Sequence, residues 1–272
     1  MPTVQEVFGQ NLRCRWPVTS PHRGLEQLIE KNKEHYRSIL KDFMRYVDQL
    51  AAIPVQAPDD SLVPYWSNIW ISGLDVVSLY GFIAINRPKL YLEIGSGNST
   101  KFVRQAIRDG NTGTQIISID PQPRANIDVL CNQVVRHHLE NIDWRPFIAA
   151  LAPGDILFFD GSHRCLQNSD VTVFFTEILP AVPKGVLIGI HDIFLPADYP
   201  DIWRGRYYSE QYLLASWLLA DAGRNLRIEL PVCWITECTH ASAVELRAEM
   251  EVLWQRLPGT QKVGGAFWIT KI

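Results

Sequence analysis

Short apolar runs alternate with amphipathic segments from residue 89 to the end of the chain. Continuous apolar runs bounded by turn residues are typical of strands that a parallel sheet buries on both faces. The predicted strands are residues 89–95, 114–121, 133–139, 154–163, 184–194, 225–232 and 265–272. The helices predicted between them are residues 99–110, 124–132, 168–179, 209–222 and 242–256, with a short helical turn at 144–151. This alternation predicts an α/β fold built on a doubly wound sheet.

The first part of the chain has a helical pattern instead. Apolar residues recur at helical spacing over residues 24–52, which predicts an amphipathic helix broken at most once. A linker with three prolines follows, at Pro54, Pro58 and Pro64. Residues 68–85 are mostly apolar and predict a second, buried helix. We therefore divide the chain into an N-terminal helical extension with its linker, residues 1–64, and a main domain, residues 65–272.

Composition narrows the class of protein. Of 272 residues, 47% are hydrophobic, which is enough for one sizeable core. The 26 basic and 29 acidic residues give a net charge of −3 without a basic run, which argues against a nucleic-acid partner. No apolar stretch reaches the roughly 18 residues of a membrane span, and the N-terminus lacks the apolar core of a secretory signal. The five cysteines form no CxxC pair, so we expect a cytoplasmic protein with reduced thiols.

Polar or ionisable residues close each of the first five predicted strands, although the packing of a core does not require them there. In a doubly wound sheet, ligands bind at the carboxyl ends of the strands, near the point where the strand order reverses. The residues at these strand ends are Glu93, Gly95, Ser96, Gly97, Asn98, Ser99, Asp120, Leu139, Glu140, Asn141, Asp160, Gly161, Ser162, His163, His191 and Asp192. We expect them to meet in one ligand site.

The first strand end contains Gly95-x-Gly97, a turn whose backbone can approach a ligand closely. A dinucleotide fingerprint needs a third glycine, and Thr100 occupies that position, which counts against NAD and FAD. Alternatively, the glycines form a plain strand-to-helix turn with Ser99 as its N-cap. Asp120 follows Gly97 by 23 residues, near the roughly 20-residue offset at which a carboxylate meets ribose hydroxyls. Together, the two features favour a ribose-bearing cofactor.

The stretches LEIGSGNST and ISIDP resemble the first two motifs of the class I S-adenosylmethionine-dependent methyltransferases. The resemblance covers about residues 65–272 and implies a Rossmann-like seven-stranded sheet whose last strand is antiparallel. It implies that Asp120 holds the ribose of the cofactor and that the loop with Glu140 borders the adenine. Because S-adenosylmethionine has no pyrophosphate, the missing third glycine is no obstacle. The resemblance also places the turn of Gly95, Ser96 and Gly97 beside the methionine part of the cofactor. It implies that Glu93 orients that loop or meets the amino group, and it adds Ser99 and Asp160 to the cofactor-binding residues.

The fourth and fifth strand ends, DGSH and HD, resemble elements shared by bacterial small-molecule methyltransferases, which include macrolide-sugar O-methyltransferases. They also align with the metal-dependent catechol-type O-methyltransferases. That match implies a divalent metal bound by Asp160, His191 and Asp192, with His163 in the place of that family's lysine base. Imidazole among the ligands suits zinc, iron or manganese better than magnesium. Alternatively, no metal binds, and His163 or His191 itself removes the proton of the acceptor.

The predicted function is methyl transfer from S-adenosylmethionine to an oxygen of a small molecule, with the oligomeric state left open. The stretches PYWSNIWISG and DYPDIWRGRYYSEQY, rich in aromatic residues, are predicted to shape the acceptor pocket. One alternative is an NAD-linked oxidoreductase or epimerase, against which Thr100 and the lack of a Tyr-x-x-x-Lys pair both count. A second alternative is a catalytically inactive cofactor-binding module whose N-terminal helix serves in assembly.

Overall fold

A seven-stranded sheet forms the centre of the computed structural model, which describes residues 13–58, 60–71, 73–257 and 260–272. The strand order is β3-β2-β1-β4-β5-β7-β6. β7 runs antiparallel to β5 and β6, and the other neighbouring strands are parallel. The strands are β1 (Leu90–Ile94), β2 (Gln115–Ile119), β3 (Gln133–Val135), β4 (Ile156–Phe159), β5 (Leu187–Ile190), β6 (Leu226–Pro231) and β7 (Phe267–Lys271). The predicted doubly wound sheet with an antiparallel last strand is confirmed.

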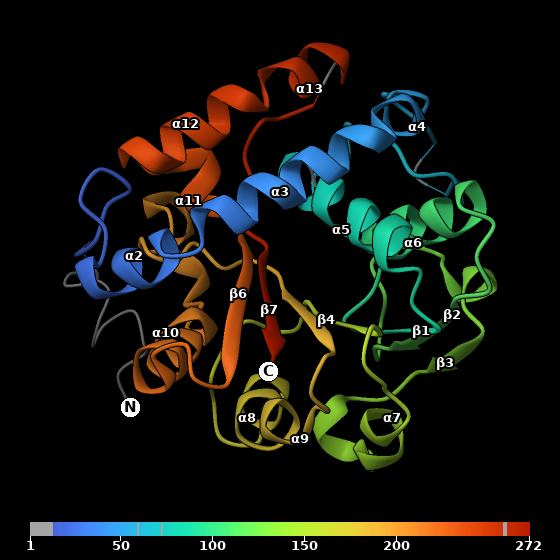
Figure 1. Ribbon diagram of the computed structural model, residues 1–272. Coiled ribbons are helices and arrows are strands. Elements are labelled where there is room, and N and C mark those ends of the chain that lie inside the picture. The colour runs from blue at the N-terminus through green and yellow to red at the C-terminus, as the bar shows by residue number, and fades with distance from the viewer. Residues whose placement is uncertain (1–12, 59, 72, 258–259) are drawn as a thin grey trace.

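Helices cover both faces of the sheet (Figure 1). α5 (Gly73–Asn86) and α6 (Asn98–Asp109) lie on one side, and α7 (Arg145–Ala149), α8 (Asp170–Val173) and α9 (Leu179–Ala181) lie on the other. The residues of β1, β4 and β5 are all buried, as expected for central strands between two helical layers. Further elements are η2 (Asp128–Leu130), η3 (Leu139–Asn141), η4 (Phe174–Ile178), η5 (Asp201–Arg206), α10 (Glu210–Asp221), α11 (Val232–Glu237), α12 (Ala241–Glu249) and α13 (Glu251–Arg256).

The N-terminal amphipathic segment forms several short helices that pack on the main domain. They are α2 (Arg23–Glu30), α3 (Lys33–Phe43), the turn η1 (Met44–Tyr46) and α4 (Val47–Ala51). One break separates α2 from α3, and the 3₁₀ turn η1 adds a second irregularity that the pattern did not predict. The apolar face is buried as predicted, with Leu25, Ile29, Tyr36, Leu40, Phe43, Val47 and Leu50 in the core.

One predicted helix is wrong, and one observed helix was not predicted. The helix predicted at residues 124–132 is wrong, because only the turn η2 forms there. Arg136 binds the Asp128 carboxylate at 2.5 Å and Arg104 binds the Leu130 carbonyl at 2.8 Å, so tertiary contacts hold this segment as a turn. α11 was not predicted, since residues 225–232 were assigned to a strand and the chain turns into a helix at Val232.

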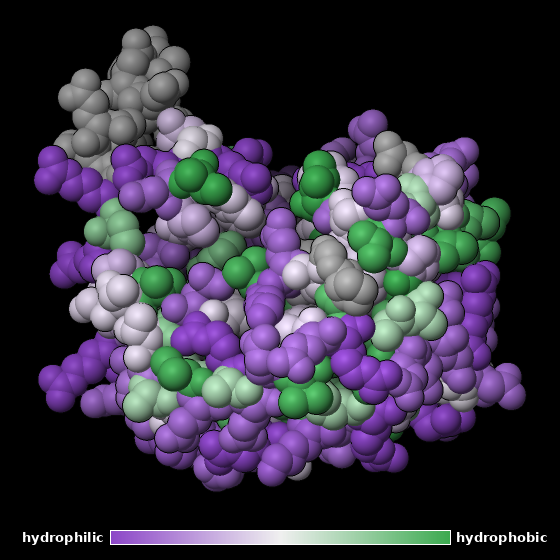
Figure 2. Space-filling view, turned by 90° about the horizontal axis from the view of Figure 1, so that it is seen from above, coloured by the Kyte–Doolittle hydropathy of each residue, from purple (hydrophilic) through white to green (hydrophobic). Residues whose placement is uncertain are grey.

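Aromatic side chains fill the core between the sheet and α5. Trp268 of β7 packs against Phe82 of α5 and Phe158 of β4, with ring centroids 4.7 and 5.6 Å away. The molecular face in Figure 2 is mainly hydrophilic, with apolar residues in small groups. In the part of the chain that the structure describes, no helix is both long and apolar enough to cross a membrane.

The sheet topology brings the predicted strand ends together. The strand order reverses between β1 and β4, which are hydrogen-bonded neighbours, and β5 lies next to β4. Because these three strands are parallel, their carboxyl ends meet at one edge of the sheet. The residues that follow Ile94, Phe159 and Ile190 are therefore neighbours in space.

Candidate active site

The turn after β1 can be made only with glycine at its first position. Gly95 has φ +79°, a conformation that side-chain-bearing residues rarely adopt. A Cβ atom at this position would lie 1.8 Å from the carbonyl oxygen of Asp160 at the end of β4. The Gly95 amide donates to the Ile119 carbonyl of β2 at 2.9 Å. The glycine thus lets β1, β2 and β4 converge closely.

Glu93 supports this turn from within the core. Its carboxylate is fully buried and accepts hydrogen bonds from the hydroxyls of Tyr91, at 2.9 Å, and Thr100. Burial raises the pKa of Glu93 to about 7, although hydrogen bonds from Ser99 and Thr100 oppose that shift. The Gly97 amide in turn donates to the Thr100 hydroxyl at 3.3 Å. Glu93 therefore positions the glycine turn through Thr100, the residue that replaces a third glycine.

Asp120 ties the ends of β1 and β2 together. Its carboxylate accepts from the Ser96 amide at 2.6 Å and from the Gln122 amide at 2.7 Å. The buried side chain therefore points towards the glycine turn. The Ser96 hydroxyl also donates to this carboxylate, at 3.4 Å. A carboxylate has about four acceptor positions, so about one remains for a further donor. Glu140 lies in η3, beyond β3, and its side chain is largely buried with His138 as a neighbour at 3.6 Å.

A cavity of about 350 Å³ opens beside the glycine turn, and we call it the cofactor-side cavity. Among the predicted site residues, it is lined by Ser96, Gly97, Ser99, Asp160, His191 and Asp192. The predicted site residues outside this lining are Glu93, Gly95, Asp120, Glu140 and His163. Its other walls are Ile69, Trp70, Ile71, Asn98, Arg124, Trp203, Arg206 and Tyr208.

Two histidines and two aspartates form a compact cluster where β4 and β5 end. His163 Nε2 lies 3.5 Å from Asp160 Oδ1 and 3.5 Å from Asp192 Oδ2. His191 Nδ1 lies 3.3 Å from Asp160 Oδ1 and 3.6 Å from Asp192 Oδ1. Both histidines are buried, whereas the Asp160 side chain keeps 31% of its surface exposed. The four predicted residues thus meet in one cluster, of which Asp160, His191 and Asp192 line the cavity.

Each histidine of the cluster has a second carboxylate behind it. His163 Nδ1 lies 2.6 Å from Glu210 Oε1, and Glu210 is fully buried at the start of α10. His191 Nε2 lies 3.3 Å from Asp75 Oδ2 of α5, which also accepts from the amides of Gly265 and Ala266. Buried carboxylates of this kind fix the orientation of an imidazole ring.

The acidic surroundings control protonation of the cluster. Burial lowers the pKa of His163, but Glu210, Asp160 and Asp192 together outweigh burial and raise that pKa to about 9. Burial likewise opposes a charge on His191, but Asp160 and Asp192 raise the pKa of His191 well above its usual value. The positive charge of His191 in turn lowers the pKa of Asp160 to about 2, against the effect of burial. Without another cation, both histidines therefore carry a proton at neutral pH.

The backbone is strained at two members of the cluster. His163 has φ +64° and Asp192 has φ +56°, the left-handed region that favours glycine. Such conformations cost free energy and persist only where surrounding contacts enforce them. The Ser209 amide, which donates to the His163 carbonyl at 2.8 Å, is one such contact.

The donor set of the cluster suits a divalent metal ion. Ligand atoms of Asp160, His163 and Asp192 all lie within 4.8 Å of one another. Two carboxylates and one imidazole with a carboxylate behind it form a common ligand set for first-row divalent metals. His191 was predicted as a ligand, and it borders the same two aspartates while its Nε2 faces Asp75. The fit therefore favours His163 as the imidazole ligand.

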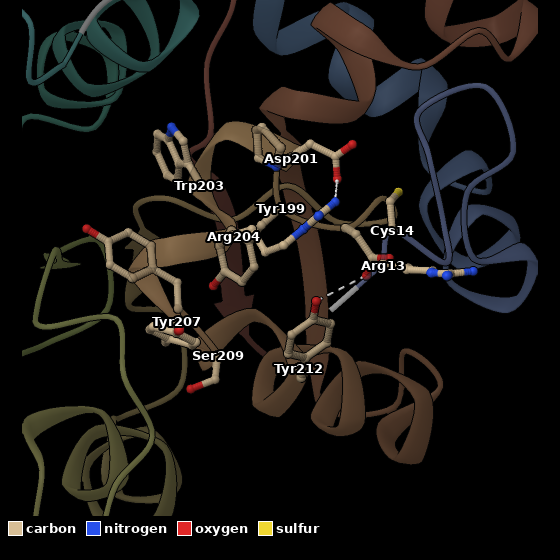
Figure 3. A pocket seen from close by; sticks show the side chains of 12 residues that line it. Arg13, Cys14, Tyr199, Asp201, Trp203, Arg204, Tyr207, Ser209 and Tyr212 are labelled. Atoms are coloured by element: carbon tan, nitrogen blue, oxygen red, sulfur yellow. Dashed lines mark hydrogen bonds and ion pairs between the residues drawn. The ribbon is translucent and has the colours of Figure 1, made fainter. Parts of the chain in front are cut away.

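A larger cavity of about 600 Å³ adjoins the cofactor-side cavity, and we call it the acceptor-side cavity. Both cavities share the wall made by Ile69, Trp70, His191, Asp192 and Trp203. The acceptor-side cavity extends towards Phe194, Tyr199 and Val263 and is mostly apolar. A third hollow of about 320 Å³ lies next to it, between η5 and α10, with Tyr199, Trp203, Tyr207 and Tyr212 around it (Figure 3).

Asp75 and Glu210 are the functional candidates that sequence reasoning missed or left unassigned. Glu210 was only one member of the aromatic stretch predicted to shape the acceptor pocket. Asp75 is an acid within an apolar helix, where a buried charge needs a partner. That signal was present in the sequence, but the partner, His191, lies 116 residues away.

Comparison with known proteins agrees with this geometry. Residues 92–193 match the family model described as "Methyltransferase domain". The matched segment begins in β1 and ends just after Asp192, so it spans the glycine turn, Asp120 and the cluster. Over this segment the chain is therefore similar to methyltransferase domains. No curated protein matches the sequence significantly.

Several solved methyltransferases are broadly similar in structure. The O-methyltransferase TomG from Streptomyces achromogenes is 15% identical, with 87% of this chain and 89% of that chain covered and a TM-score of 0.36. An O-methyltransferase from Bacillus cereus is 16% identical, with 86% and 90% covered and a TM-score of 0.43. The plantazolicin methyltransferase BpumL is 13% identical, with 92% and 99% covered and a TM-score of 0.43. Similarity at this level says nothing about the substrate of this chain.

Proposed function

We propose that this methyltransferase transfers a methyl group from S-adenosylmethionine to an oxygen atom of a small molecule. The observation that carries the proposal is the position of the cluster of Asp160, His163, His191 and Asp192. Asp160, His191 and Asp192 line the cofactor-side cavity, and His191 and Asp192 also line the acceptor-side cavity. A group that removes a proton is useful where a cofactor and an acceptor meet.

The residues around the glycine turn have distinct proposed roles towards the cofactor. Ser96, Gly97 and Ser99 border the methionine part, because they line the cofactor-side cavity. Asp120 holds the ribose with the acceptor position that Ser96 and Gln122 leave free. The remaining roles are indirect or peripheral: Glu93 and Gly95 shape the turn, Glu140 borders the adenine, and Asp160 closes the cavity.

Histidine is the proposed base. Transfer from a sulfonium requires the acceptor oxygen to lie in line with the methyl group and to lose its proton. His191 lines both cavities, whereas His163 is buried and contacts Asp160 and Asp192 of the cavity wall. Either histidine must be neutral before it can take a proton. Since the acidic neighbours raise both pKa values, the rate is expected to rise with pH through the range in which the base deprotonates.

We further propose that Asp160, His163 and Asp192 can hold a divalent metal ion, with His191 then left as the base. A bound divalent ion would supply positive charge that lowers the pKa of an acceptor hydroxyl. The negative charges of the two aspartates would balance the charge of the metal ion. Without a metal ion, the two histidines beside them balance these charges by binding protons. Metal binding would therefore compete with protonation of the cluster.

Calorimetric titration with S-adenosylmethionine, S-adenosylhomocysteine and NAD tests the cofactor. We expect micromolar binding of both sulfur compounds and none of NAD. Tight binding of NAD together with silence from the sulfur compounds would support the alternative of an oxidoreductase or epimerase.

Metal analysis of the purified protein tests the ligand set. Stoichiometric metal in the wild type, lost in Asp160→Ala and His163→Ala and kept in Asp143→Ala, is the expected result. Asp143 is an exposed acid paired with Arg145, so it controls for the loss of a charge. Equal metal content in all four proteins would remove Asp160 and His163 from the ligand set.

Methylation of a panel of hydroxylated small molecules tests catalysis. We expect His191→Ala to lower turnover by about a hundredfold or more while cofactor affinity is kept. A protein that binds the cofactor and shows no sensitivity to His163→Ala or His191→Ala would fit the inactive binding module instead.

We also propose that residues 65–272 form the domain that carries the activity and that residues 1–64 form a helical extension of this domain. A cytoplasmic location and the oligomeric state stay predictions.

A further inference from the structure

Two arginines line the cofactor-side cavity from opposite flanks. Arg124 belongs to the loop after β2, and Arg206 ends η5, which follows β5. In the sheet order, β2 and β5 lie on either side of the pair β1 and β4. The two loops therefore approach the cavity from both sides of the point where the strand order reverses.

Aromatic rings hold both guanidinium groups in place. The Arg124 guanidinium lies 4.4 Å from the ring centroid of Trp70. The Arg206 guanidinium lies 3.9 Å from the centroid of Trp203 and 5.6 Å from that of Tyr208. Stacking on a ring uses the face of the guanidinium and leaves its N–H groups free to donate in the plane. Both side chains are thus preorganised for an acceptor in the cavity.

The described residues offer these two guanidinium groups no ion pair and no hydrogen-bond acceptor. By contrast, neighbouring Arg204 pairs with Asp201 at 2.7 Å. Arg124 does act at longer range on Asp160, where it contributes to the lowered pKa of that acid. The acids nearest the cavity, Asp160 and Asp192, are engaged with the two histidines. The positive charges of both guanidinium groups are therefore available to a ligand in the cavity.

We infer that Arg124 and Arg206 form a carboxylate-binding clamp in the cofactor-side cavity. A guanidinium can donate two parallel N–H hydrogen bonds to the two oxygens of a carboxylate. A ligand hydroxyl or amide has only one oxygen and cannot accept both bonds in this geometry. The carboxylate can come from the methionine part of the cofactor or from an acid group of the acceptor. The first source rests on the proposed function, and the second does not.

Two matched ligand pairs distinguish the sources. S-Adenosylhomocysteine and 5′-methylthioadenosine share the thioether adenosine, but only the first carries the amino acid with its carboxylate. 4-Hydroxybenzoate and phenol differ only in a carboxylate. Calorimetry is run on the wild type and on Arg124→Met and Arg206→Met, which keep an unbranched apolar side chain without the charge. Arg108→Met is the control, because Arg108 is an exposed arginine of α6 outside the cavity.

If the clamp holds the cofactor, Arg124→Met and Arg206→Met should each lower the affinity for S-adenosylhomocysteine by about tenfold or more. The affinity for 5′-methylthioadenosine should stay unchanged. If the clamp holds the acceptor, the same variants should lower the affinity for 4-hydroxybenzoate and leave the affinity for phenol unchanged. Arg108→Met should alter neither pair. Thermal unfolding of each variant confirms that the fold is intact.

The inference is overturned if neither variant separates the carboxylate ligand from its partner in either pair. Failure of the wild type to bind both S-adenosylhomocysteine and 5′-methylthioadenosine would instead count against the proposed function. In that case the pair of phenols decides the inference alone, and absence of a carboxylate preference there counts against the clamp.

Discussion

Single side chains at this site take their chemistry from burial and from one or two neighbours. Glu93 and Glu210 are both fully buried, and burial raises the pKa of each to about 7. Their partners differ: Glu93 receives only hydroxyl donors, whereas Glu210 faces an imidazole. One carboxylate therefore supports a loop, and the other controls the charge of His163.

Replacing Glu93 by glutamine should flatten the pH dependence of stability. A raised folded-state pKa means that the contribution of Glu93 is fully present below its unfolded value of 4.5 and is lost as pH rises through about 7. The free energy of unfolding of the wild type should thus fall by on the order of 3 kcal/mol more than that of Glu93→Gln across this window. Urea unfolding at a series of pH values measures it, with exposed Glu245→Gln as control. Parallel pH curves for wild type and Glu93→Gln would contradict this account.

Replacing Glu210 by glutamine should lower the pKa of His163 below its value of about 9. The amide oxygen can still accept from Nδ1, but it lacks the negative charge through which Glu210 raises the pKa of His163. Titration of the histidine ring signals by NMR measures the shift in protein stripped of metal. Glu229→Gln is the matched control, because Glu229 contacts His35 and not His163. An unchanged titration of His163 would remove Glu210 as its controlling partner.

At the scale of elements, close helix packing positions the N-terminal extension on the main domain. α3 crosses α5 at Gly81, where a Cβ atom would lie 2.2 Å from the ring of Phe43. Phe43 also meets Phe82 edge to face at 5.1 Å. Glycine is unfavourable inside a helix, so its presence in α5 is explained by the close approach of the Phe43 ring.

Alanine at position 81 should therefore destabilise the protein despite its higher helix propensity. We expect Gly81→Ala to lower the free energy of unfolding by about 1–3 kcal/mol, because the buried Phe43 ring must move. Gly113→Ala is the control, since a Cβ there meets no atom within 4 Å. Urea unfolding compares the two. If Gly81→Ala proved as stable as Gly113→Ala, the proposed crowding would be absent.

At the scale of the whole molecule, the acceptor-side cavity is assembled from segments far apart in the sequence. Residues near both ends of the chain line it, including Pro17 and Val263. Asp198 fastens the N-terminal side of this wall: its carboxylate accepts from the amides of Arg15, at 2.6 Å, and Trp16, at 2.9 Å. The Asp198 amide returns a bond to the Trp16 carbonyl at 2.8 Å.

Removing this carboxylate should release the N-terminal segment without disturbing the cofactor site. We expect Asp198→Ala to speed hydrogen exchange at Arg15 and Trp16 by about a hundredfold, which corresponds to roughly 3 kcal/mol of lost charge-assisted hydrogen bonding. Affinity for S-adenosylhomocysteine should stay unchanged, because Asp198 does not line the cofactor-side cavity. Asp201→Ala serves as control, since its exposed pair with Arg204 contributes little. Slow exchange retained in Asp198→Ala would show that other contacts hold the segment.

Sequence alone determined the alternation of strands and helices and the set of polar strand ends. Because parallel strands end at a common edge, the identity of Asp160, His163, His191 and Asp192 was enough to predict that they would meet. Local patterns also identified the glycine turn, whose conformation depends on the missing side chain of Gly95 itself.

Tertiary structure decided what no local pattern carries. The segment 124–132 has helical spacing, but arginines from elsewhere in the chain hold it as a turn. The pairing of His163 with Glu210 and of His191 with Asp75 depends on where α10 and α5 meet the sheet. A charge acts through space over a few ångströms, so the protonation of these histidines follows from the folded arrangement and not from sequence spacing.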